Sequence, residues 1–348
     1  MINILILGIG GNVSQGILKA IRMCNIETHI VGACISPYSS GLYMCDEALI
    51  SPFANDGHFI KWVIDTSNKY QIDIIFTGVE ENIIVLEKNI AQIRKETNAI
   101  FVASDYEMLK IGQNKYDTCR WLKENGCNYP RFARLDDSKE FNDLVGNCGF
   151  PLIAKPVNGK SATGLIIVEN EQQLKAIYGL KNYVLEEYLP DGLEYTVGCY
   201  CDKEGELRKI IIMQRILRKG TTVYSKVVND NDIEREATLI CKRFKPRGPL
   251  NIQMRKNKAG QPVAFELNVR FSGSTAMRSN FGFRDVEAMI KEYVLKQDIS
   301  SCFNIIYGES FRYDNEFYLF HNQVSDMKDK QMIKNHDTFY DTSLSDGK

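Results

Sequence analysis

The stretch 262-PVAFELNVR-270 decides how the second half of this chain folds. A β-strand alternates its side chains between two faces. One predicted face carries Val263, Phe265, Leu267 and Val269, and the other carries Ala264, Glu266, Asn268 and Arg270. The upstream strand, 250-LNIQMRK-256, alternates likewise, and the intervening 257-NKAGQ-261 resembles a hairpin turn. We therefore expect two neighbouring strands with oxygen-bearing side chains on one face and core residues on the other.

The polar face of this strand pair predicts a metal and phosphate site. Gln253, Glu266 and Asn268 offer three oxygen ligands of the kind that Mg²⁺ prefers. Arg270 on the same face could steady phosphoryl oxygens through its planar guanidinium. The alternative is a solvated outer face. Four successive positions without Lys or Thr, followed by the loop 272–274, disfavour that alternative.

A second signal lies upstream, where Lys155 ends the apolar strand 150-FPLIAKP-156 and precedes the loop 158-NGKSATG-164. A lysine at a strand end before a small-residue loop suits a nucleotide triphosphate, because the ammonium and the loop N–H groups both meet phosphate oxygens. The alternative is a solvated lysine. Lys115, on its predicted helix, gives a weaker signal of the same kind.

Residues up to about 104 alternate strands with helices, which predicts a parallel, doubly wound sheet. Ligands on such sheets bind beyond the carboxyl ends of the strands, where the turns 8–12 and 77–82 fall. The predicted strands are Ile2–Leu7, His29–Cys34, Ile72–Phe76 and Ala99–Ala103, and the predicted helices are Val13–Met23, Phe59–Tyr70 and Glu80–Lys95.

The rhythm then changes to an α+β pattern with a largely antiparallel sheet. Ser104 with Glu107 forms a capping-box pattern before a helical stretch. We expect a last helix over 285–295 and a peripheral segment beyond residue 322. The predicted strands are Leu152–Lys155, Leu165–Val168, Tyr183–Glu187, Glu194–Cys201, Leu207–Leu217, Leu250–Lys256 and Pro262–Arg270.

Gly8, Gly10 and Gly11 after the first strand invite a dinucleotide-binding interpretation. The G-x-G-x-x-G fingerprint requires a third glycine where Val13 stands, and no acidic residue ends the second strand. A tight turn between strand and helix is the preferred interpretation, with a small-molecule contact as the alternative.

Composition narrows the class of protein. The chain has 348 residues, with 43 Lys and Arg against 44 Asp and Glu, so no charge excess indicates a nucleic acid or membrane partner. The first residues read as a buried strand rather than a secretory signal. Ten scattered cysteines, without a C-x-x-C pair, and four histidines give little support to zinc and favour reduced thiols in the cytoplasm.

Six segments together carry a resemblance: 114-NKYDT, 151-PLIAKPVNGKSATGL, 184-VLEEYLPDGLEYTVG, 213-MQRILRKG, 248-GPLNIQMR and 265-FELNVRFSGS. Their order resembles that of ATP-grasp enzymes, most of all the large subunit of carbamoyl-phosphate synthetase and its single-module relatives. The resemblance implies an α/β pre-ATP-grasp domain (1–104) and then an α+β ATP-grasp fold of two subdomains. These are a small subdomain with a glycine-rich lid loop (105–188) and a large subdomain with the metal site (189–310). A C-terminal segment (311–348) would be peripheral.

Carried over position by position, the resemblance implies roles for most of the candidate residues. Lys115, Lys155 and Ser161 would contact ATP phosphates, Glu186, Glu187 and Leu189 would receive adenine, and Glu194 would hold the ribose hydroxyls. Gln253, Glu266 and Asn268 would bind two Mg²⁺ ions, with Mn²⁺ as a substitute. Arg270 and Arg215 would stabilise the phosphoryl group.

The substrate residues do not come from that carry-over. We expect the carboxylate substrate between Arg270, Arg278 and the turn 77–81. Glu80 and Glu81 could recognise an amino group, and the alternative is that they are acidic partners of a helix N-terminus. Ser272 and Arg278 could line the acceptor pocket, and the alternative is that they belong to a turn.

The activity implied is that of a carboxylate–amine ligase which forms an amide through an acyl phosphate and releases ADP and phosphate. Its partners would be small-molecule carboxylates and amines, with neither nucleic acid nor membrane, and a homodimer by analogy with relatives. Ser161-Ala162 departs from the Gly-Ser common in relatives, which puts loop closure and turnover speed in question. A non-catalytic ATP-binding module and a kinase- or carboxylase-type activity remain the alternatives.

Overall fold

The computed structural model describes residues 1–159, 163–190, 192–314, 316–319 and 323–335. The chain forms two compact units. Unit 1 comprises Met1–Ala103, Arg270–Ile305 and Arg312–Lys348, and unit 2 comprises Ser104–Val269 and Ile306–Phe311. No helix in the described part is long and apolar enough to cross a membrane. The division of the ATP-grasp part at 188/189 stays a prediction.

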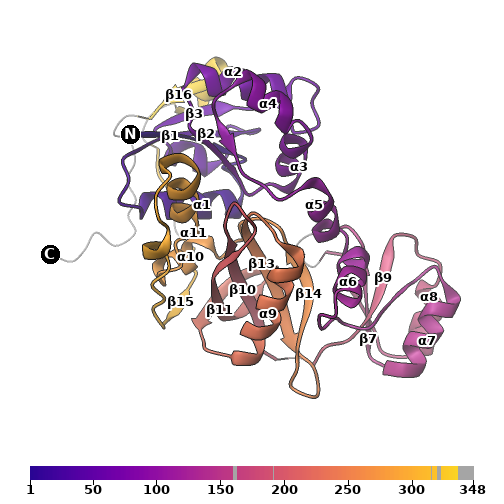
Figure 1. The fold of residues 1–348 in the computed structure, drawn as a ribbon. Coiled ribbons are helices and arrows are strands. Elements are labelled where there is room, and N and C mark those ends of the chain that lie inside the picture. Colours follow the sequence, from indigo (N-terminus) through magenta and orange to yellow (C-terminus); the bar gives the residue numbers. More distant parts are fainter. Residues whose placement is uncertain (160–162, 191, 315, 320–322, 336–348) are drawn as a thin grey trace. The chain divides into compact units, whose positions relative to one another are not determined.

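Unit 1 is built on a six-stranded sheet in the order β16-β3-β2-β1-β4-β5 (Figure 1). The central strand β1 (Ile2–Leu7) is parallel to both of its neighbours, and Ile4 to Leu7 are fully buried, as expected for a strand covered on both faces. The predicted parallel α/β sheet is therefore confirmed. The other strands are β2 (Thr28–Cys34), β3 (Glu47–Ile50), β4 (Ile74–Thr77), β5 (Ile100–Phe101) and β16 (Met332–Lys334).

The predicted helices of unit 1 are present with two differences, and η1, α10 and α12 were not predicted. The predicted helix over 80–95 is two helices, which meet at Asn89. The predicted helix over 285–295 begins as an α-helix and ends as a π-helical turn. The helical elements are α1 (Asn12–Arg22), η1 (Ser40–Met44), α2 (Phe59–Lys69), α3 (Glu80–Lys88), α4 (Ile90–Glu96), α10 (Thr275–Asn280), α11 (Asp285–Met289), η2 (Ile290–Leu295), η3 (Ser300–Cys302) and α12 (Gln323–Lys330).

The glycine turn after β1 has a structural reason. Gly8 has φ +62°, and a Cβ there would lie 2.3 Å from Cγ2 of Val79. Only glycine combines a left-handed backbone with such a close approach. The conformation of the turn after β4 therefore depends on a glycine in the turn after β1.

The C-terminal segment, expected to be peripheral, supplies the edge strand β16. It runs antiparallel to β3, with Lys334 opposite Glu47. Asn335 follows and donates its side-chain N–H groups to the carbonyls of Leu42 and Cys45, at 2.9 and 2.8 Å. β3 was not predicted from the sequence, so neither was this pairing.

Unit 2 contains two antiparallel sheets, as the α+β pattern predicted. The larger has the order β14-β13-β10-β11-β12-β15, and α9 (Asn231–Phe244) packs on it with Ile233, Ala237, Ile240 and Phe244 buried. Its strands are β10 (Glu194–Cys201), β11 (Leu207–Arg218), β12 (Thr221–Val227), β13 (Gly248–Lys256), β14 (Pro262–Asn268) and β15 (Glu309–Phe311).

The smaller sheet of unit 2 has the order β6-β9-β7-β8 and its own apolar core with α7 (Ser138–Cys148) and α8 (Glu171–Ile177). Its strands are β6 (Phe132–Arg134), β7 (Leu152–Pro156), β8 (Ile166–Val168) and β9 (Tyr183–Glu187). Two helices, α5 (Tyr106–Gln113) and α6 (Lys115–Glu124), pack against β14.

The predicted capping box at Ser104 is wrong. Asp105 is the N-cap of α5, without a side-chain cap hydrogen bond. The hydroxyl of Ser104 instead accepts a hydrogen bond from the backbone N–H of Arg247 at 3.0 Å. Ser104 is therefore hydrogen-bonded to a residue far away in the sequence rather than to the first turn of α5.

Candidate active site

The predicted oxygen ligands come together on the β13–β14 pair. Gln253 lies opposite Glu266 in the register, and all three candidate ligands are half-buried. The side-chain amide of Asn268 donates to Oε1 of Glu266 at 3.0 Å. That bond leaves Oδ1 of Asn268 and Oε2 of Glu266 without a hydrogen-bond donor among the described residues. Three oxygens on paired strands fit a hard divalent cation, whose site phosphate and water would complete.

A β-bulge changes one face of this strand pair. The register passes from Gln253–Glu266 to Met254–Ala264 and skips Phe265. Ala264 is fully buried, whereas Phe265 is only half-buried, so the predicted core position of Phe265 and outward position of Ala264 are wrong. Nζ of Lys155 lies 5.2 Å from the centroid of the Phe265 ring. The bulge therefore moves an aromatic ring from the expected core face to the side of the candidate nucleotide lysine.

Lys155 and Glu186 form a buried ion pair across β7 and β9. Nζ lies 2.6 Å from Oε2, and the side chains are 12% and 1% exposed. The thiol of Cys119 lies beside the carboxylate; burial first, and then the Glu186 charge, raise the pKa of Cys119 well above its ordinary value. Oε1 of Glu186 is buried and accepts no N–H or O–H hydrogen bond in the described part of the chain. An orphaned acceptor of this kind fits an amino group such as that of adenine.

Lys115, the first residue of α6, is tied to the start of the glycine-rich loop. Its Nζ donates to the carbonyl of Gly159 at 3.0 Å, and its backbone N–H donates to the carbonyl of Val157 at 2.9 Å. The loop that follows β7 therefore begins against this lysine. Ser161, a predicted phosphate contact, lies outside the described residues, as does its departure from the common Gly-Ser pattern.

Glu194 sits between two arginines on the large sheet. Nε of Arg215 on β11 donates to Oε1 at 3.0 Å, and Nη2 of Arg255 on β13 donates to Oε2 at 3.2 Å. Nη1 of Arg215 lies 3.5 Å from Oγ1 of Thr222. Glu194, which was expected to bind ribose, and Arg215, which was expected at the phosphoryl group, are therefore hydrogen-bonded to each other. Arg255 has no predicted role, although its alternation with Gln253 placed it on the same face.

Glu187 and Leu189 continue the strand that carries Glu186. Strand alternation turns Glu187 to the opposite side, where the Cys148 thiol lies 3.8 Å from its Oε2. Burial raises the pKa of Glu187, and the neighbouring Arg131 offsets part of that rise. Leu189 is buried. On the Lys155 side, this segment therefore offers a ligand its backbone groups rather than the side chains of Glu187 and Leu189.

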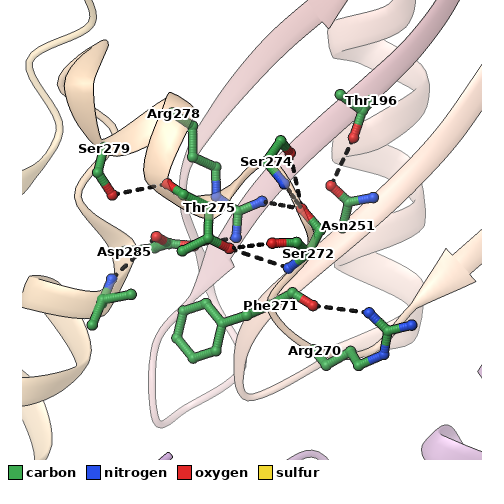
Figure 2. A network of polar contacts seen from close by, with 11 residues as sticks. Thr196, Asn251, Arg270, Phe271, Ser272, Ser274, Thr275, Arg278, Ser279 and Asp285 are labelled. Carbon is green, nitrogen blue, oxygen red and sulfur yellow. Dashed lines mark hydrogen bonds and ion pairs between the residues drawn. The ribbon is translucent and has the colours of Figure 1, made fainter. Parts of the chain in front are cut away.

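The remaining candidates belong to unit 1. Nη2 of Arg270 and Oε2 of Glu80 lie 3.9 Å apart, while Glu81 is exposed. Nη1 of Arg270 donates to the carbonyl of Phe271 at 3.0 Å, as Figure 2 shows. The structure thus brings two of the predicted substrate-side residues together at the start of α3.

Arg278 is buried and belongs to the network of polar contacts drawn in Figure 2. Its side chain is 1% exposed and forms an ion pair with Asp285, whose side chain is fully buried. Nη1 of Arg278 donates to the hydroxyl of Ser272 at 3.2 Å, and that hydroxyl lies 2.9 Å from the hydroxyl of Ser274. Arg278 therefore fixes the loop after Arg270 from within. Asp285 carried no signal in the sequence beyond opening a helix.

Protein-family models match segments in both halves of the chain. Residues 4–102 match the model of the PylC-like N-terminal domain, and residues 180–301 match the model "ATP-grasp in the biosynthetic pathway with Ter operon". Together with the curated relatives, these matches confirm the recognition of an ATP-grasp chain made from the sequence.

Curated relatives and solved structures agree with this assignment of the fold. A D-alanine–D-alanine ligase of Cupriavidus taiwanensis is 32% identical over 111 residues, which is 31% of this chain and 33% of that ligase. The N-terminal section of the carbamoyl phosphate synthase large chain of Methanopyrus kandleri is 20% identical over 84% of this chain and 55% of its own length. An L-amino acid ligase from Bacillus licheniformis superposes with a TM-score of 0.68 at 16% identity, covering 92% of this chain and 82% of the ligase. The chain thus spans about a third of the D-alanine–D-alanine ligases that it matches.

Proposed function

Since the chain carries an ATP-grasp domain behind a PylC-like N-terminal domain, we propose that it is an ATP-dependent carboxylate–amine ligase. The observation that carries the proposal is the oxygen set of Gln253, Glu266 and Asn268 on paired strands, in the same unit as the Lys155–Glu186 pair. A non-catalytic module would not require three candidate metal ligands on one strand pair.

The nucleotide is assigned to unit 2. Lys115 and Lys155 bind its phosphates, and Oε1 of Glu186 accepts a hydrogen bond from the adenine amino group. Backbone groups of Glu187 and Leu189 complete the adenine contacts, and Ser161 adds a phosphate contact. Glu194 holds the ribose hydroxyls with Arg215 and Arg255 fixing its carboxylate.

Gln253, Glu266 and Asn268 hold Mg²⁺, for which we propose two ions, with Mn²⁺ as a substitute. The metal supplies charge neutralisation at the phosphoryl oxygens. Glu266 is the one carboxylate of the set, so its removal affects the site most. The amide of Asn268 orients Glu266 through their mutual hydrogen bond.

The proposed reaction has two displacements. A carboxylate oxygen of the substrate attacks the γ-phosphorus in line; the new O–P bond forms as the bond to the β-phosphate oxygen breaks, and ADP leaves. An amine nitrogen then attacks the acyl carbon; the C–N bond forms, the bond to the phosphate oxygen breaks, and the amine proton leaves with phosphate or solvent. Arg270 stabilises the oxyanion of the addition step. A role for Arg215 in phosphoryl transfer requires it to exchange Glu194 for the phosphoryl group.

The test is ADP release from Mg-ATP with a panel of carboxylates and amines, with Glu266→Gln as the isosteric control. Substrate-dependent ADP and phosphate that vanish in the control support the proposal. AMP and pyrophosphate as products contradict the mechanism, and failure to bind Mg-ATP contradicts the assignment of unit 2. A homodimer and a cytoplasmic location stay predictions, the first checked by light scattering.

A further inference from the structure

Unit 1 holds an acidic and a basic side chain that face each other without a hydrogen bond. Nη2 of Arg270 and Oε2 of Glu80 are 3.9 Å apart, beyond the usual length of an N–H···O bond. Their side chains are only 19% and 22% exposed, so both charges are held largely out of water. A surface ion pair normally closes to hydrogen-bond distance or stays solvated, and this pair does neither.

Both groups keep open hydrogen-bonding capacity. Arg270 donates from Nη1 to the carbonyl of Phe271, and no described residue accepts a hydrogen bond from its Nε or Nη2. Within the described ranges, no donor forms a hydrogen bond with the carboxylate of Glu80. Partly buried charged groups usually find hydrogen-bond partners, because leaving them unpaired is costly. The pair therefore fits a ligand that brings both a donor and an acceptor.

The location is one where ligands bind. Glu80 opens α3 three residues after β4 ends, at the carboxyl edge of the parallel sheet. The loops of the same edge are tied together by Arg312, which donates from Nη1 to Oδ1 of Asn12 at 3.2 Å and from Nη2 to the carbonyl of Gly273 at 2.7 Å. The turn after β1 and the loop after Arg270 are thus held in one place.

We infer that the carboxylate substrate is an α-amino acid, whose ammonium binds Glu80 and whose carboxylate binds Arg270. The ammonium and the carboxylate of an α-amino acid are attached to the same carbon. They therefore match the side chains of Glu80 and Arg270, whose opposite charges face each other across a short gap. A simple carboxylate would bring its negative charge against Glu80, and a simple amine would leave Arg270 unmatched. The proposed function assigns to Arg270 the oxyanion of the addition step, so the α-carboxylate that Arg270 binds is the group activated. The inference rests on the proposed ligase function.

The first measurement is calorimetric titration of the full chain, with Mg²⁺ and a non-hydrolysable ATP analogue present. The ligands are the common α-amino acids of both hands, each beside its des-amino carboxylic acid and its decarboxylated amine. We expect at least one amino acid to bind and both of its analogues to bind roughly 10- to 100-fold more weakly, as for the loss of one charged hydrogen bond.

Variants test whether Glu80 binds the ammonium of the ligand and Arg270 its carboxylate. Glu80→Gln should weaken the amino acid roughly 10- to 100-fold and leave the des-amino acid unchanged or tighter, because a repulsive charge is gone. Arg270→Gln should weaken both. Glu96→Gln, the same change at an exposed residue of α4, is the matched control and should alter neither. Thermal unfolding of each variant checks that the fold is retained.

Two binding results overturn the inference, and a third result comes from turnover. The binding results are that no amino acid binds, or that Glu80→Gln weakens the binding of the amino acid and of its des-amino analogue equally. ADP release driven by a carboxylate without an amino group, and insensitive to Glu80→Gln, also overturns it but leaves the ligase proposal standing. Binding of an amino acid that depends on Glu80, with no ADP released in the presence of any amine, supports the inference and contradicts the ligase proposal.

Discussion

Nζ of Lys155 lies 2.6 Å from Oε2 of Glu186, although 31 residues separate them in the chain. Ile153 is opposite Glu186 in the β7–β9 register, so Lys155, two residues on, reaches the same face of the sheet. The lysine expected at the phosphates is thus held by the carboxylate expected at the adenine. One buried pair positions both ends of the proposed nucleotide site.

Lys155→Met leaves a buried carboxylate without its counter-charge. We expect the free energy of unfolding to fall by about 3–5 kcal/mol and ATP binding to be lost, as measured by denaturant titration and nucleotide calorimetry. The double change Lys155→Met with Glu186→Leu should recover much of the stability and none of the ATP binding. A double variant as unstable as the single one would mean that the ion pair is not the cause.

Glu266→Ala removes the only carboxylate of the proposed metal set. We expect ADP release to fall roughly a hundredfold or more, because the metal contributes several kcal/mol to the transition state. Glu266→Asp should instead raise the Mg²⁺ concentration needed for half-maximal rate. Glu124→Ala, at an exposed position of α6, is the control. Normal turnover in Glu266→Ala would exclude the β13–β14 pair as the metal site.

Asp230 gives a pH-dependent prediction. Its Oδ1 accepts from the backbone N–H groups of Asp232 and Ile233, and its Oδ2 lies 2.6 Å from Nζ of Lys256. Burial alone would raise the pKa of Asp230, but the Lys256 ion pair and these backbone donors outweigh it and hold the pKa below its ordinary value. A lowered pKa in the folded state stabilises the protein above the ordinary carboxyl value and ceases to do so as pH falls through the folded value.

Asp230→Asn keeps the N-cap of α9 and removes only the charge. We expect it to lower the free energy of unfolding by about 1 kcal/mol at neutral pH, with the difference vanishing as the pH falls through the lowered pKa of Asp230. Denaturant titrations across that range measure it, with Asp143→Asn as an exposed control. A difference that does not depend on pH would point to the cap rather than the charge.

Removing β16 should destabilise unit 1. Deleting residues 331–348 removes the hydrogen bonds from Ile50 N–H to the Gln331 carbonyl and from Asn335 N–H to the Asp46 carbonyl, besides the two from the Asn335 side chain. We expect a loss of roughly 2–4 kcal/mol, about 1 kcal/mol for each bond. Deleting residues 336–348 alone is the comparison. Equal stability of the two truncations would show that β16 contributes nothing.

The buried pair of Arg278 and Asp285 separates a structural role from a substrate role. Arg278→Met should lower the free energy of unfolding by about 3–5 kcal/mol, because Asp285 stays buried without its partner. Ser279→Ala, on the same helix, removes one hydrogen bond to the Thr275 carbonyl and should cost about 1 kcal/mol. A stable Arg278→Met variant that loses only ligand binding would instead assign Arg278 to the substrate.

Much of the candidate site could be located from the sequence, because its signals are local. The candidate oxygen ligands follow from a period of two along β13 and β14, and Lys155 follows from a strand end before a glycine-rich loop. The bulge that brings Phe265 out of the core could not be predicted, since it arises from how β14 pairs with β13 and leaves no periodic trace. The hydrogen bonds from Arg215 and Arg255 to Glu194 could not be predicted either, because they depend on the order of three strands.

The sequence by itself determined the parallel and antiparallel halves, the ordered ATP-grasp motifs and many of the elements, because periodicity and turn chemistry act over a few residues. It did not predict β3, β12 or α9. Only the tertiary structure decided which of the candidate residues lie in contact with one another. It paired Lys155 with Glu186, placed Glu80 against Arg270, buried Arg278 on Asp285, and bound Asn335 to Leu42 across 293 residues. Burial and charge pairing depend on the whole packed chain, so no local pattern specifies them.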